Sequence, residues 1–232
     1  MVNKSFTAPC IVTGWPAAWA DAFPKAQIVA DEDTLALEPA AHDLVIHALA
    51  LHWANDPVGQ LIQMRRALRP DGLMLAVLLG GTTLNELRTV LAQAESELSG
   101  GLSPRVAPMG ELRDTGGLLQ RAGFALPVAD SVPLRASYAD LSALMHDLRA
   151  MGETNAMTAR PRHMTGRALF ARASALYAQH FAGADARLIA TYDMTVLTGW
   201  APHKSQPQPL RPGSASARLA EALGTRETPL ED

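Results

Sequence analysis

Two buried apolar runs joined by a short helical segment constrain the fold of this chain more than any other feature. The first, HDLVIHALALHWAND at residues 42–56, has an acidic residue near its start and ends in polar and aromatic residues. The second, RPDGLMLAVLLGG at residues 69–81, is equally apolar. Both runs are continuous rather than alternating, which is typical of parallel strands covered on both faces. They predict a βαβ unit of an open α/β sheet, which binds ligands where its strands end.

Helix signals flank these runs. Asn55 or Asp56 is predicted to cap the intervening helix, with Pro57 at its first position. Thr83, followed three residues later by Glu86, has the pattern of a capping box at the start of another helix. Apolar residues recur at helical spacing behind that pair, at Leu84, Leu87, Val90, Leu91 and Leu98.

The remaining segments predict further elements of the same α/β type. Strands are expected at 9–14, 26–31, 124–130 and 131–136, and an antiparallel closing strand at 186–200. Helices are expected at 16–23, 110–122, 138–151 and 165–181. The loop at 100–108, GGLSPRVAP, is long enough to arch over a pocket.

Composition limits the functional class. The 232 residues are 48% hydrophobic with a net charge of −3, which favours one globular domain, predicted at 1–215, with a polar tail at 216–232. Acidic residues outnumber basic ones, so a nucleic-acid partner is not expected. No apolar stretch approaches the roughly 20 residues of a membrane span. Cys10 is the single cysteine and is expected to be buried in a cytoplasmic protein.

The D-L-V-I strand, the H-W exit and the L-R-P-D-G turn resemble the class I S-adenosylmethionine (SAM) methyltransferases. From about residue 29 to 215 the chain more closely resembles the branch containing the mitochondrial complex I assembly factor that acts as a protein-arginine hydroxylase, with its bacterial relatives. The malonyl-carrier-protein O-methyltransferases are more distant. The pieces that carry the closer resemblance are ALALHWAND, LRPDGL, LGGTTLNELR, GGLSPRVAP, LLQRAGF, DLRAMGETNA and TGWAPHKSQPQPLRPGSA.

This resemblance implies a Rossmann-like methyltransferase sheet, mostly parallel with an antiparallel closing strand. It also implies SAM as cofactor, with a protein or small molecule as substrate. The sequence departs from the family at VTGWPAAWA, residues 12–20, where Gly14 stands alone and Trp15 and Pro16 replace further glycines. No room remains between Phe23 and Gln27 for the family's second strand and its helix, so the sheet is expected to be abbreviated at its N-terminal side. Either SAM binds in an altered mode or this chain has lost it.

The candidate cofactor residues follow three predicted strands. Gly14 follows the first, and the resemblance places Asp31 and Glu32 where the family contacts adenine; a solvated acidic turn is the alternative. The third strand ends in His47, Ala48 and Leu49, a segment that passes close to the cofactor in the family. His47 could instead be a hydrogen-bonded core residue.

The candidate catalytic residue is His52, because an imidazole titrates near neutral pH and can act as a general base. Trp53 could form a pocket wall or a wedge between strand and helix. Gly81, Thr82 and Arg88 are candidate substrate-binding residues because they follow the second buried strand. The pair His47 and His52 lacks further ligands, so no metal site is predicted.

A further polar cluster, comprising Glu153, Asn155, His203, Ser205 and Gln206, could form a lid or a partner surface. Two functions remain open. One is a SAM-dependent methyltransferase; the other is a non-catalytic or divergent relative that binds a partner such as a respiratory-complex subunit. A homodimer that completes the abbreviated fold is a third alternative.

Overall fold

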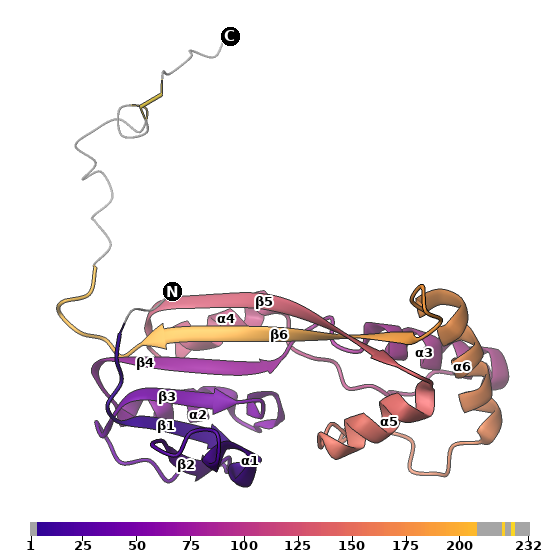
Figure 1. Cartoon of the computed structure of the whole chain (residues 1–232), viewed down its shortest axis with the longest axis horizontal. Coiled ribbons are helices and arrows are strands. Elements are labelled where there is room, and N and C mark those ends of the chain that lie inside the picture. The colour runs from indigo at the N-terminus through magenta and orange to yellow at the C-terminus, as the bar shows by residue number, and fades with distance from the viewer. Residues whose placement is uncertain (1–3, 208–219, 221–223, 226–232) are drawn as a thin grey trace. The chain divides into compact units, whose positions relative to one another are not determined.

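The structure, a computed structural model, describes residues 4–207, 220, 224 and 225. The chain divides into two compact units, residues 1–202 and 203–232. The first contains a six-stranded sheet with the order β2-β1-β3-β4-β6-β5 (Figure 1). Its strands are β1 (Pro9–Thr13), β2 (Gln27–Ala30), β3 (His42–Ala48), β4 (Leu68–Leu79), β5 (Ala125–Tyr138) and β6 (Leu188–Trp200). In the second unit, the His203 backbone N–H donates to Gln206 and the Ser205 hydroxyl lies 2.8 Å from His203 Nδ1.

The helices connect and flank these strands. They are α1 (Pro16–Ala20), α2 (Pro57–Ala67), α3 (Asn85–Ser99), α4 (Leu112–Arg121), α5 (Leu141–Ala150) and α6 (Arg167–Phe181), with a 3₁₀ turn η1 (Leu51–Trp53). Within the described residues, none of these helices has the length and apolarity needed to cross a membrane.

Strands β2, β1, β3 and β4 are parallel, and β6 and β5 are antiparallel to their neighbours. The predicted fold class, a mostly parallel α/β sheet with an antiparallel strand, is confirmed. A single strand, β1, lies between β2 and β3, so the sheet is short on that side, as the spacing between Phe23 and Gln27 predicted. The predicted boundary between domain and tail near residue 215 lies outside the described residues.

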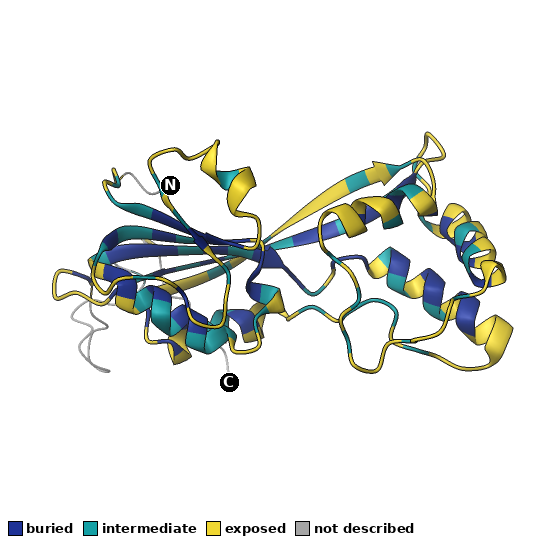
Figure 2. Ribbon diagram, turned by 90° about the horizontal axis from the view of Figure 1, so that it is seen from below, coloured by how far each residue is buried: buried dark blue, intermediate teal, exposed yellow. Residues whose placement is uncertain are grey.

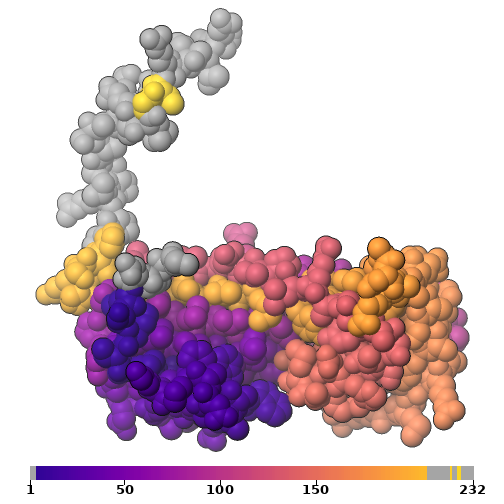
Figure 3. Space-filling model, in the orientation of Figure 1, coloured from indigo at the N-terminus to yellow at the C-terminus, as the bar shows by residue number. Residues whose placement is uncertain are grey.

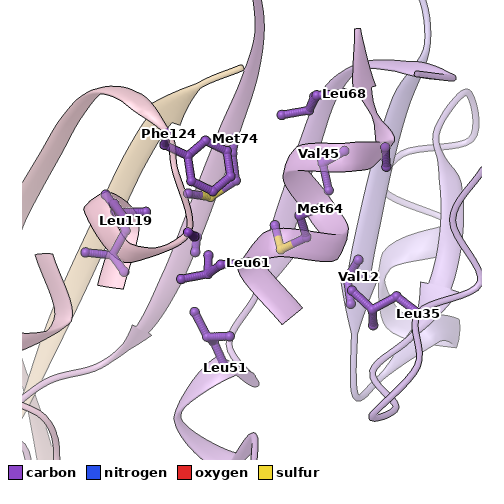
Figure 4. Packing of buried hydrophobic residues seen from close by; sticks show 14 of the residues in the cluster. Val12, Leu35, Val45, Leu51, Leu61, Met64, Leu68, Met74, Leu119 and Phe124 are labelled. Atoms are coloured by element: carbon purple, nitrogen blue, oxygen red, sulfur yellow. The ribbon is translucent and has the colours of Figure 1, made fainter. Parts of the chain in front are cut away.

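One hydrophobic core lies between the sheet and helices α2 and α4. The α2 side chains of Leu61 and Met64 are fully buried against Val45 and Met74 of the central strands (Figure 4). Asp56 caps this helix by accepting a hydrogen bond from the Gly59 backbone, one of the two predicted caps. Cys10 belongs to this core, as predicted, and burial raises the pKa of its thiol to about 11.

A second core joins the distal ends of β5 and β6 to helices α3, α5 and α6. The predicted apolar face of α3 is buried there at Leu84, Leu87, Val90 and Leu91, whereas Leu98 is 53% exposed. Figure 2 shows the alternation of buried and exposed turns along these helices.

Two local predictions were wrong. Segments 124–130 and 131–136 form one continuous strand, β5, although it contains Pro127 and Pro133. The predicted capping box does not form, because α3 begins without a side-chain cap. The Thr83 hydroxyl accepts a hydrogen bond from the Asp193 N–H, and the Glu86 carboxylate accepts from Thr191. Both side chains therefore fasten α3 to β6 rather than to its own first turn.

Candidate active site at the carboxyl edge of the sheet

The carboxyl ends of the parallel strands bring the candidate residues to one edge of the sheet. After β3, Leu49 takes a left-handed backbone conformation (φ 55°) and its N–H donates to Val77. The chain then enters the 3₁₀ turn that carries His52 and Trp53. Parallel sheets bind ligands at this edge because the chain turns away there and leaves a crevice.

His52 is paired with an acidic residue from a distant segment. Its Nε2 lies 3.0 Å from Glu153 Oε1, and the two side chains are only 5% and 9% exposed. The Trp53 indole N–H also donates to that oxygen, at 3.4 Å. His52 Nδ1 is buried and has no hydrogen-bond partner among the described residues. Because the Glu153 carboxylate accepts a hydrogen bond, the neutral His52 ring carries its proton on Nε2 and donates it to Glu153. The other nitrogen, Nδ1, is then a proton acceptor.

Cavities flank this pair. One, of about 250 Å³, is lined by Trp15, Leu49, Leu79, Ala150, Met151 and Glu153. Another, of about 190 Å³, has His52 in its wall and is otherwise lined by Leu51, Ala54, Pro57, Leu78, Pro108, Met109, Gly110, Thr115 and Leu118. The polar pair thus lies in predominantly apolar surroundings, which is typical of small-molecule sites.

Trp15 contributes to the first cavity and packs against the turn after α5. A Cβ atom built on Gly152 would lie 3.0 Å from the Trp15 ring, and Gly152 has φ +80°. The Trp15 side chain is nevertheless 56% exposed. It therefore forms one wall of the cavity without filling it.

Gly152→Ala is expected to lower the free energy of unfolding by about 1–2 kcal/mol, because alanine is strained at positive φ and its Cβ would crowd Trp15. Urea denaturation measures the change. Gly100→Ala is the matched control, since Gly100 also has a positive φ (+67°) but a Cβ there meets nothing within 4 Å. Equal effects of the two substitutions would contradict the Trp15 contact.

His47 and Asp31 lie in a buried polar network. His47 is fully buried, and its Nε2 lies 3.0 Å from Gln60 Oε1 and 3.3 Å from Asp31 Oδ1. The Gln60 amide also donates to Asp31, at 2.9 Å, and to the Glu32 carbonyl. Burial alone would raise the pKa of Asp31, but the hydrogen bonds from His47 and Gln60 outweigh it and lower the pKa. The structure therefore agrees with the alternative in which His47 is a hydrogen-bonded residue of the core.

The lowered pKa of Asp31 predicts a specific pH dependence. Because the folded pKa lies below the unfolded value of about 3.9, the carboxylate stabilises the fold above that pH and this stabilisation is lost as the pH falls through the folded pKa. Asp31→Asn should therefore destabilise the protein at neutral pH, and the difference from wild type should shrink between about pH 5 and pH 3. Urea denaturation across that range checks this; a constant difference would contradict it. Glu32→Gln, at the exposed neighbouring position, is the control.

The other candidate residues are dispersed along the same edge. Gly14 is exposed, and a Cβ there would touch only Ala50, at 3.9 Å. Glu32 is also exposed, whereas Ala48 is buried at the end of β3. The structure leaves the backbone of Gly14 open to a ligand.

The candidate substrate residues instead make contacts within the protein. A Cβ on Gly81 would lie 2.9 Å from the Glu111 carboxylate. The Thr82 hydroxyl donates to Asp193, and Arg88 donates to the Ala107 carbonyl at 3.2 Å. Arg88 thus supports the 100–108 loop, in which Arg105, Val106 and Ala107 line a small cavity with Trp53 and Glu153.

A cluster of hydrogen bonds that the sequence did not predict also holds the 100–108 loop in place. Glu95 on α3 accepts hydrogen bonds from the Arg105 guanidinium, at 2.7 Å, and from the Ser103 hydroxyl and N–H. The Arg105 and Ser103 hydrogen bonds lower the pKa of Glu95 to about 2. A buried glutamate on the apolar face of a helix was the available signal. The Asn155 amide holds the loop from the other side by donating to the Pro104 and Arg105 carbonyls.

Comparisons with known proteins agree with this geometry. Residues 6–76 match the model of a methyltransferase domain. The chain is 40% identical over 190 residues to the mitochondrial arginine-hydroxylase NDUFAF5 of Dictyostelium discoideum, covering 82% of this chain and 43% of the relative. It is 37% identical over 198 residues to the human NDUFAF5, covering 85% and 57%.

A malonyl-[acyl-carrier protein] O-methyltransferase of Xylella fastidiosa is 37% identical over 179 residues, covering 77% of this chain and 58% of the relative. The chain spans about half the length of the curated relatives it matches. Among solved structures, a candidate type II methyltransferase of Anaeromyxobacter dehalogenans has a TM-score of 0.51 at 20% identity, covering 85% and 92%. A Bacillus halodurans candidate methyltransferase gives 0.51 at 14% identity, covering 87% and 94%.

The mostly parallel sheet, with cavities at its carboxyl edge, is a Rossmann-like methyltransferase fold. The predicted resemblance to the class I SAM-dependent methyltransferases is confirmed, and within it the chain is similar to the NDUFAF5 arginine hydroxylases and to the malonyl-carrier-protein O-methyltransferases.

Proposed function

We propose that this protein is a SAM-dependent methyltransferase whose catalytic base is His52. The observation that supports the proposal best is the buried pair of His52 and Glu153. It lies beside the cavity of about 250 Å³ that Trp15 helps to line, which we call the cavity under Trp15. Glu153 orients the ring and stabilises its protonated form, and Nδ1 accepts the proton of an attacking O–H or N–H group. Bound SAM would supply the methyl group.

The carboxyl edge retains features that suit a nucleoside cofactor. The Gly14 backbone is open, the Glu32 carboxylate is exposed, and the cavity under Trp15 is largely apolar. His47 and Gln60 both contact Oδ1 of Asp31, which directs this oxygen into the protein, whereas Glu32 is exposed. We therefore assign the polar contact with adenine to Glu32 rather than to Asp31.

Titration calorimetry with SAM and with its demethylated product tests the cofactor assignment. Both ligands should release or absorb heat, and Glu32→Gln should weaken binding by roughly tenfold, as expected for one hydrogen bond to a charged group. Asp31→Asn should leave the affinity nearly unchanged when the protein is kept at neutral pH and shown to be folded. The absence of both heat and thermal shift at millimolar ligand would reject the cofactor.

The second candidate is a partner-binding relative without methyl transfer. It is favoured by the internal contacts of Asp31 Oδ1 and by Trp15, which lies where the family has glycines. Relatives named arginine-hydroxylase NDUFAF5 support a protein rather than a small molecule as partner, and the family resemblance points to a respiratory-complex subunit.

The cytoplasmic location is part of either proposal and rests on the single buried cysteine.

Affinity purification of the tagged chain from its own cells distinguishes the two. A partner-binding protein should enrich complex I subunits over an untagged control, and Glu153→Gln should not diminish that enrichment. Methyl transfer by the purified chain without such enrichment would exclude the second candidate.

A further inference from the structure

The segment between β2 and β3, residues 31–41, contains no helix or strand, but α2 holds it at three places. Gln60 and Gln63 bind it through their side-chain amides, and the Arg66 carbonyl accepts a hydrogen bond from the Ala40 N–H at 2.9 Å. These three positions are three residues apart along α2, so they lie on one side of the helix. That side of α2 therefore fastens the segment to the rest of the protein.

Gln63 makes two hydrogen bonds to the backbone of residues 31–35, which we call the acidic loop. Its amide N–H donates to the Asp33 carbonyl at 2.9 Å, and its amide oxygen accepts from the Leu35 N–H at 2.8 Å. The Leu35 side chain is buried in the first core at the end of the loop. Gln63 itself is only partly buried, so its replacement should leave that core intact.

The other end of the acidic loop is bonded to β1 and to Gln60. The Asp31 N–H donates to the Thr13 carbonyl at 3.1 Å. The Gln60 amide donates to the Asp31 side chain and to the Glu32 carbonyl. Hydrogen bonds therefore hold the backbone on both sides of Glu32. Gly14, whose backbone is open to a ligand, directly follows Thr13 at the same edge of the sheet.

The Glu32 side chain, in contrast, is exposed and makes no hydrogen bond or ion pair with the described residues. Figure 3 shows the N-terminal segment, in indigo, at the surface along the β2 edge of the sheet. A glutamine amide holds a backbone without adding charge, whereas a lysine or arginine in its place would pair with the nearby carboxylate. The Glu32 carboxylate thus stays free for a ligand, on a backbone that is already in place.

We propose that Gln63 is a positioning residue for the cofactor: it holds the acidic loop so that Glu32 distinguishes adenine from hypoxanthine. This inference rests on the proposed function, in which Glu32 accepts a hydrogen bond from the adenine amino group. Hypoxanthine has an oxygen in place of that amino group and an N–H on the adjacent ring nitrogen. Because a carboxylate only accepts hydrogen bonds, Glu32 on a held loop faces this oxygen without a donor. On a released loop it moves to the neighbouring N–H and the distinction is lost.

Calorimetric titration with S-adenosylhomocysteine and S-inosylhomocysteine tests the proposal, since these ligands differ only in the base. The wild type should bind the adenine ligand at least about tenfold more tightly, as expected for one hydrogen bond to a charged group. Gln63→Ala should lower this preference by roughly three- to tenfold, because a released loop must be ordered again and adapts to either base. Gln93→Ala, the same substitution at an exposed position of α3, is the matched control and should leave the preference unchanged.

Two further measurements separate hydrogen bonding from packing. Gln63→Met has a side chain of similar length without an amide, so it should lose the preference as Gln63→Ala does; a methionine variant with the full preference would overturn the proposal. Cleavage after Glu32 by a glutamate-specific protease should be several-fold faster in Gln63→Ala than in the wild type or in Gln93→Ala. Equal cleavage of all three proteins would show that Gln63 does not hold the loop.

The titrations also distinguish failure of this proposal from failure of the cofactor assignment. A preference for the adenine ligand that Gln63→Ala leaves unchanged would reject the role of Gln63 and leave the cofactor assignment intact. Equal binding of both ligands by the wild type would reject Glu32 as the contact with adenine, and the positioning role with it. A wild type that binds neither ligand would reject the cofactor and this proposal together.

Discussion

Asp193→Ala is expected to lower the free energy of unfolding by roughly 3 kcal/mol, because a buried carboxylate that accepts several hydrogen bonds is lost. Asp193 is 7% exposed and accepts from the Ser131 hydroxyl and from the Thr82 hydroxyl and N–H. Its own backbone accepts from Gly80 and donates to Thr83. The residue thus joins β5, β6 and the turn that follows β4.

Urea denaturation measures the loss, with Asp33→Ala at an exposed position as the control. The hydrogen bonds from Ser131 and Thr82 lower the pKa of Asp193 against the effect of burial. The stabilisation is therefore present above the ordinary aspartate range and disappears as the pH falls below about 4. A loss for Asp193→Ala no larger than that of the control at neutral pH would show that the cluster contributes little.

Glu153→Ala is expected to destabilise the protein by about 2 kcal/mol, because it leaves the buried His52 ring without a partner on either nitrogen. It also removes the acceptor of the Trp53 indole. The turn after α5 should then separate from η1, and thermal unfolding together with tryptophan fluorescence reports both changes.

Glu153→Gln is the conservative control, since an amide oxygen still accepts from His52 and Trp53. It should restore most of the stability while removing the negative charge. If methyl transfer is found, Glu153→Gln should lower turnover much more than it lowers stability. A glutamine variant as unstable as the alanine variant would indicate that charge, rather than hydrogen bonding, holds His52.

The sequence predicted most closely those helices and strands that are determined by residues near one another in the chain. The run from residue 42, Pro57 and the L-R-P-D-G turn predicted β3, α2 and β4 closely, because hydrophobic pattern and helix breakers act locally. The family and the abbreviated sheet also followed from motifs and from the short spacing between Phe23 and Gln27.

Contacts between distant segments could not be predicted. The sequence separates His52 from Glu153 by 101 residues, and no local pattern indicates that they meet. Thr83 and Glu86 satisfied the capping-box pattern, yet the unpaired groups of β6 compete for the same side chains and bind them. Gln60 was missed although a polar residue on the buried side of a helix signals an internal partner.

The position of β6 has a consequence for folding during synthesis. Although β6 is the last strand, it lies between β4 and β5 and joins them. Strand β5 therefore has no strand to pair with until β6 has left the ribosome, so the backbone hydrogen-bonding groups that face β6 stay unpaired until then. Pairings between distant segments form slowly, and unpaired apolar strands aggregate. Overexpression at low temperature or with chaperones should therefore raise the yield of folded protein more than changes of buffer do.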